Sequence, residues 1–81
     1  MSFEERRILR EKLIRDLYNY HFENAGRELT LTFNLDIKED KEQHLAYQYW
    51  EGKGLINYDL ISKGDLYAVK INSYGIDYVE K

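Results

Sequence analysis

The chain has no cysteine and only two histidines, and these shortages remove several classes of function. Without cysteine there can be no disulfide framework, no thiolate zinc site and no cysteine nucleophile. His21 and His44 lie on different predicted elements and show neither HxxxH nor HxH spacing, so a metal site would need distant carboxylates. We therefore expect neither a metal site nor a cofactor.

Long apolar runs are also missing. No stretch approaches the roughly 20 apolar residues that a membrane-spanning helix requires. The first residues, MSFEERRILREK, carry charges where a signal peptide needs an apolar core. Together these features predict a soluble, cytoplasmic protein with no membrane partner.

The residue patterns of catalysis are lacking as well. The chain contains no GxxxxGK[ST] phosphate loop, and no spacing suggests a Ser–His–Asp arrangement. Asp59 and Asp65 fall on a predicted hairpin, whereas Glu39 and Asp40 begin a predicted helix, where carboxylates offset the helix dipole. We expect no catalytic residues and a protein that is not an enzyme.

The residues that are present suit one small globular domain spanning residues 1–81. Eight Tyr, three Phe and one Trp occur among many Leu and Ile, with charges of both signs interspersed. The formal net charge is −3. This balance weighs against a nucleic-acid partner, because DNA-binding domains are usually basic.

Hydrophobic spacing and turn residues predict six elements. Helices are expected at residues 3–22, where Ser2 and Glu5 match a capping box and Gly26 follows the end, and at residues 38–53. A strand is expected at 28–33, a hairpin at 55–61 and 66–72, and a short last helix capped by Asn72. Residues 34–37 leave room for a single turn, with Asp36 able to cap the second helix. The order indicates an α+β fold.

Within the second helix, the expected inner side consists of Leu45, Ala46, Tyr49 and Trp50. The expected outer side consists of Gln43, His44, Tyr47, Gln48 and Glu51. From Lys38 to Lys53 the chain contains three lysines and four carboxylates. Phosphate would repel Glu39, Asp40 and Glu42 unless they point away from it.

Two segments of the C-terminal half carry a family resemblance. Residues 46–56, AYQYWEGKGLI, resemble the A-x-x-Y-L-E-x-K-G-L-I end of the third helix in small bacterial and phage winged-helix proteins. Residues 71–80, INSYGIDYVE, resemble the I-T-x-x-G-I-D-Y-L-E that follows their wing. The resemblance implies a winged helix: helix, short strand, helix, β-hairpin wing and short C-terminal helix. Trp50 replaces the usual Leu, the second helix of that family is shortened or lost, and the third carries few cations.

The resemblance implies a DNA-binding transcriptional regulator of bacterial or prophage origin, with double-stranded DNA as partner. The third helix would enter the major groove and the wing would touch the backbone. The residues expected to contact DNA are Lys41, Gln43, His44, Tyr47, Gln48 and Lys63. For the helix residues the alternative is a solvated surface, and for Lys63 it is a plain turn.

The sequence also suggests two kinds of protein partner: a second copy of the chain and a different protein. Arg6 and Arg10 project near the apolar stripe of Leu13 and Leu17, so the first turns can extend past the core and pack on a second copy, giving a homodimer through the N-terminal helix. The alternative function is a winged-helix protein-interaction module, such as an anti-repressor or an assembly subunit, which the acidic balance and the many aromatics favour. Tyr58 and Tyr67 invite a stacking platform for single strands, but cross-strand packing is the favoured reading.

Overall fold

The computed structural model describes residues 1–81 and contains three helices and one three-stranded antiparallel sheet, an α+β fold. The elements follow the predicted order, and their bounds differ from the predicted ones by no more than one residue. They are α1 (Phe3–Glu23), β1 (Leu29–Thr32), α2 (Lys38–Gly52), β2 (Ile56–Ser62), β3 (Leu66–Ile71) and α3 (Ser73–Glu80). None of the three helices is both long enough and apolar enough to cross a membrane.

Most of the predicted end signals are confirmed. Ser2 Oγ accepts a hydrogen bond from the Glu5 amide at 3.2 Å, and Glu5 accepts one from the Ser2 amide at 2.9 Å, which completes the capping box. The Asn72 side chain caps α3 by accepting from the Gly75 amide. The predicted cap at Asp36 is wrong, because α2 begins after Ile37 without a side-chain cap.

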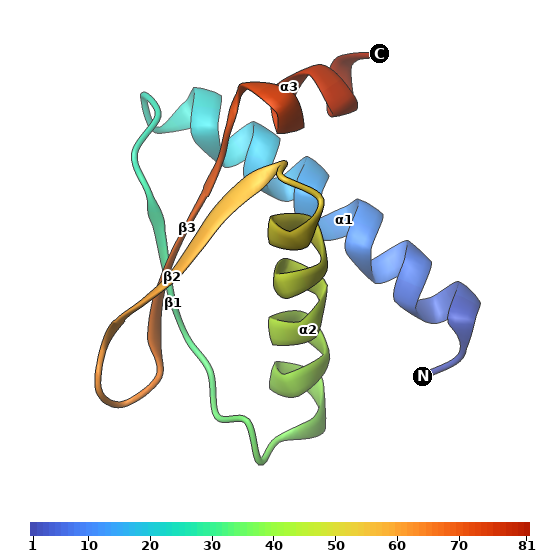
Figure 1. Ribbon diagram of the computed structural model, residues 1–81, viewed down its shortest axis with the longest axis vertical. Coiled ribbons are helices and arrows are strands. Elements are labelled where there is room, and N and C mark those ends of the chain that lie inside the picture. Colours follow the sequence, from blue (N-terminus) through green and yellow to red (C-terminus); the bar gives the residue numbers. More distant parts are fainter.

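The sheet has the order β1-β3-β2, so β3 is central and pairs with both neighbours. Leu31 and Leu60 both lie opposite Tyr67, and Thr30 and Asp59 both lie opposite Ala68. Because side chains alternate between the two faces of a strand, one face is mainly apolar and the other mainly polar. The helices lie on the apolar face, so the molecule has two layers (Figure 1).

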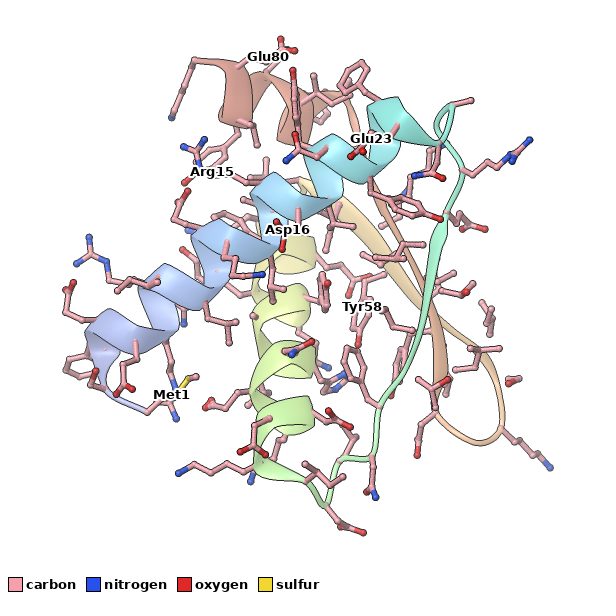
Figure 2. The ribbon with its side chains drawn as sticks, turned by 180° about the vertical axis from the view of Figure 1, so that it is seen from behind. Met1, Arg15, Asp16, Glu23, Tyr58 and Glu80 are labelled. Carbon is pink, nitrogen blue, oxygen red and sulfur yellow. The ribbon has the colours of Figure 1, made fainter.

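The core lies between these layers. From α1 it takes Leu13, Ile14 and Leu17; from α2, Ala46, Tyr47 and Trp50; and from the sheet and the end of β1, Phe33, Ile56, Tyr58, Tyr67, Val69 and Ile71. α1 crosses α2, and its first turns extend past α2 into solvent, as the two opposite views show (Figures 1 and 2).

The orientation of α2 differs from the predicted one. Ala46 and Trp50 are buried as expected, but Leu45 is 47% exposed and Tyr49 36% exposed, whereas Tyr47 is only 4% exposed. The helix is therefore rolled from the Leu45 and Tyr49 edge toward Tyr47, by less than the roughly 100° that separates neighbouring residues. The cause is an aromatic cluster formed by Phe33, His44, Tyr47, Tyr58 and Tyr67, which draws the side of α2 that bears His44 and Tyr47 inward.

Candidate nucleic-acid interface

The solvent-facing side of α2 carries a stripe of residues spaced three and four apart. The members of this outer stripe, all exposed, are Lys38, Lys41, Leu45, Gln48 and the adjoining Tyr49. Residues at these spacings lie along one face of a helix. The outer stripe therefore presents two cations, one amide and two apolar side chains on a single surface.

The structure separates the predicted DNA-contacting residues into two groups. Lys41 and Gln48 lie on the outer stripe, and Lys63 lies exposed at the tip of the β2–β3 hairpin. Gln43 and His44 are half-buried and Tyr47 is buried, so their placement on the outer side of α2 is wrong. A partner that approached the exposed side of α2 would therefore contact residues of the first group and not those of the second.

The aromatic cluster explains why His44 and Tyr47 turn inward. His44 Nδ1 and the Tyr58 hydroxyl share a hydrogen bond of 2.8 Å, which gives both polar groups a partner (Tyr58 is labelled in Figure 2). Burial raises the pKa of Tyr47 to about 12 and raises the pKa of Tyr58 further. The hydroxyls therefore stay neutral and the rings serve packing.

The paired tyrosines of the hairpin belong to the same cluster. Tyr58 and Tyr67 stack with ring centroids 5.0 Å apart and planes 13° apart. Both are buried beneath the helices, so neither offers a face to a base. The packing interpretation of these two residues is confirmed.

Two carboxylates of α2 already have hydrogen-bond partners within the chain. Glu42 is only 6% exposed and receives hydrogen bonds from Arg6 Nε at 3.0 and 3.2 Å. The hydrogen bonds from Arg6 lower the pKa of Glu42 below its usual value, so it remains an anion that is already paired. Asp40 accepts a hydrogen bond from the backbone N–H of Asn34 at 2.9 Å. Neither carboxylate lies on the outer stripe.

The hairpin tip adds a second exposed feature. Gly64 and Asp65 adopt φ values of +98° and +65°, which close the loop next to Lys63. The pairing of β2 with β3 shifts between Leu60 and Ser62, so Ile61 is an extra residue that bulges outward. The tip and the amino-terminal end of α2 lie toward the same end of the long axis of the molecule (Figure 1).

Sequence reasoning missed Lys38, Leu45 and Tyr49 as surface residues. The three-four spacing of Lys38, Lys41, Leu45 and Gln48 was a usable signal, because it outlines a helix face as clearly as an apolar stripe does. The inward Glu42 had no such signal, since its partner Arg6 lies on another helix.

No group of three or more His, Asp or Glu side chains is arranged to hold a metal ion. Comparisons of the chain with protein-family models, with curated proteins and with solved structures find no match.

Proposed function

We propose that this chain is a winged-helix regulator of transcription that binds double-stranded DNA. In this arrangement α2 is the recognition helix, its outer stripe enters the major groove, and the β2–β3 hairpin is the wing that meets the backbone. The order of elements and the central position of β3 in the sheet support the winged-helix interpretation.

One observation carries the proposal: the outer stripe is cationic although the whole chain is acidic. Lys38 and Lys41 are exposed on it, while Glu42 is paired with Arg6 and Asp40 with the Asn34 amide. Affinity for duplex DNA comes largely from cations that replace condensed counterions at phosphates. Two of the three acids that would repel phosphate, Asp40 and Glu42, are therefore engaged elsewhere, whereas Glu39 stays exposed in the first turn of α2.

The dimensions of the stripe also suit a groove. From Lys38 to Gln48 the helix rises about 15 Å at roughly 1.5 Å per residue. The major groove of B-DNA is about 12 Å wide and admits an α-helix, whose diameter with side chains is about 10–12 Å, so the stripe could lie along it. Gln48 is the residue of the stripe best suited to reading sequence, because a glutamine amide can pair with an adenine edge in two places.

A fluorescence anisotropy titration with pooled labelled duplexes tests this proposal. We expect binding at about 50 mM salt that weakens as salt rises, with a slope near −3 if Lys38, Lys41 and Lys63 each neutralise one phosphate. Lys41→Gln should weaken binding to all duplexes and reduce the slope by about one. Gln48→Ala should weaken binding mainly to the preferred sequences.

Lys12→Gln is the matched control for lost charge. Lys12 is exposed on α1, away from the outer stripe, and pairs there with Asp16 at 2.8 Å. This variant should bind duplex DNA as the wild type does. Equal losses for Lys12→Gln and Lys41→Gln, or no wild-type binding at about 50 mM salt, would contradict the proposal.

A protein-interaction module is the alternative, and the apolar content of the same surface favours it. Leu45 and Tyr49 add exposed apolar surface to the outer stripe beyond its two cations, and Phe3 is 86% exposed on the turns of α1 that extend past α2. A second copy of the chain is the partner that Phe3 would meet in a homodimer. Light scattering tests this: a monomer mass at every concentration would exclude the homodimer, and a stoichiometric protein partner without DNA binding would favour the alternative.

A further inference from the structure

A half-open groove of about 410 Å³ lies where α1, the end of α2 and α3 meet. Its apolar lining comes from Trp50, Leu55 and Tyr78, and Tyr49 stands at its side. The Trp50 and Tyr78 rings contact each other with centroids 5.2 Å apart. This volume lies within the range of about 300–1,000 Å³ that is typical of small-molecule sites.

Two cations at this groove have no counter-ion. The Arg10 guanidinium lies 4.1 Å from the centre of the Tyr49 ring, and Lys53 Nζ lies 5.5 Å from the same centre. Neither side chain forms an ion pair, although four other cations of the chain do. Two like charges held beside one ring repel each other, and a bound anion would relieve that repulsion.

The remaining charges of the groove are already engaged. Glu11 accepts a hydrogen bond from the Tyr78 hydroxyl and also lies 3.8 Å from Arg15. Arg7 pairs with Glu4 at 3.0 Å. The lining therefore presents a net positive charge at Arg10 and Lys53 beside an aromatic floor.

We propose that this groove binds a small planar aromatic molecule that carries an anionic group, either a phosphate or a carboxylate. The anion would lie between Arg10 and Lys53, since guanidinium and ammonium groups donate charge-assisted hydrogen bonds to such oxygens. The ring of the ligand would lie against Trp50, Leu55 and Tyr78 and gain from the removal of apolar area from water.

This site shares only Tyr49 with the outer stripe proposed for DNA. The groove adjoins the carboxyl end of α2, whereas Lys38 and Lys41 lie in its first turns. The hairpin tip also lies toward the amino-terminal end of α2 (Figure 1). Ligand binding here does not depend on whether the outer stripe binds DNA, so the two proposals can fail independently.

Trp50 is the only tryptophan of the chain and lines the groove, so its fluorescence reports binding. Phenyl phosphate is the probe, because it combines a ring with an anion. Inorganic phosphate and benzyl alcohol each supply one half of it. We expect a saturable change with phenyl phosphate and at least about tenfold weaker binding of either half, because the two contributions add in free energy.

The charge requirement is tested with Lys53→Gln, an exposed position at the end of α2. We expect it to weaken binding of phenyl phosphate about tenfold or more, as loss of a hydrogen bond to a charged group does. Lys63→Gln, at the hairpin tip, removes the same charge and should bind as the wild type does. Arg10→Gln repeats the test with the other cation, and circular dichroism checks that each variant is folded.

Four outcomes would overturn the proposal. One is the absence of a saturable fluorescence change with phenyl phosphate. Another is binding of benzyl alcohol that is as tight as that of phenyl phosphate. Equal losses in Lys53→Gln and Lys63→Gln would mean that the effect is one of net charge. A loss of duplex DNA binding in Lys53→Gln as large as that in Lys41→Gln would assign the groove to the DNA surface instead.

Discussion

Replacing Trp50 with alanine tests whether α1 and α2 share one core. Trp50 is only 5% exposed and packs its ring against Tyr78. Its Nε1 donates a hydrogen bond of 2.8 Å to the Arg10 carbonyl oxygen, which joins α2 to α1. The substitution therefore removes a large apolar contact and the bond between two helices at once.

The expected cost follows from the buried area. An aromatic side chain buries about 150–250 Å², which at roughly 25 cal/mol per Å² contributes about 4–6 kcal/mol. A compact unfolded state lowers this to about 3–5 kcal/mol, the usual range for replacing a buried tryptophan with alanine. A chain of 81 residues has a total stability of about 4–12 kcal/mol, so Trp50→Ala should lose much or most of it.

Urea unfolding followed by circular dichroism measures this loss. Trp50→Phe keeps most of the ring but not the hydrogen bond to Arg10, and should cost about 1–2 kcal/mol. Tyr74→Ala is the matched control, because Tyr74 is 70% exposed and its replacement should change stability by about 0.5 kcal/mol or less. A wild-type midpoint for Trp50→Ala would refute the packing described for α1 and α2.

Three further predictions concern the inner side of α2. In the same urea assay, Tyr47→Ala should lower the free energy of unfolding by about 3–5 kcal/mol and Leu45→Ala by about 0.5 kcal/mol or less. The reverse order would mean that Leu45 is buried and Tyr47 exposed, as the sequence predicts. Arg6 lowers the pKa of Glu42, so the pair stabilises the fold above the ordinary value of 4.5 and this contribution is lost as the pH falls through the lowered pKa. Glu42→Gln should therefore reduce the fall in melting temperature that accompanies a decrease in pH below 4.5. An unchanged fall would count against the stabilising role of the Arg6–Glu42 pair. Burial raises the pKa of Tyr47 from 10.0 to about 12, so its contribution is complete below pH 10.0 and is lost as the pH rises toward 12. Tyr47→Phe should lose less stability over that alkaline interval in thermal melts, and wild-type behaviour there would contradict the effect of burial.

Much of the fold could be predicted because its signals are local. The capping box of Ser2 and Glu5 and the cap of α3 by Asn72 each depend on residues three positions apart. The hairpin likewise depends on Gly64 within a short loop between two strands. Interactions of this range can be read from a sequence without knowledge of the tertiary structure.

The roll of α2 could not be predicted in the same way. Leu45 and Tyr49 are apolar and four residues apart, so they look like a core pair. The side that is buried instead carries Glu42 and His44, whose polar atoms find partners 36 and 14 residues away in the chain. Because these partners come from α1 and β2, only the assembled fold shows that the two polar residues can face inward.

The same limit applies to the candidate interface. Lys41, Gln48 and Lys63 were selected from the sequence and lie on exposed surface. Their contact with DNA remains a prediction. The residues that were misplaced with them, His44 and Tyr47, lie on the side whose burial depends on distant aromatic partners.

The bonds that α1 makes to α2 have a mechanical consequence. Arg6 holds Glu42, and the Arg10 carbonyl oxygen holds Trp50, so α2 is attached at two points roughly two helical turns apart. A helix held by one contact can rotate about it, whereas a helix held by two contacts keeps its orientation relative to α1. The backbone beneath Lys41 and Gln48 thus keeps a fixed orientation, so the binding proposed for this face would cost less ordering entropy.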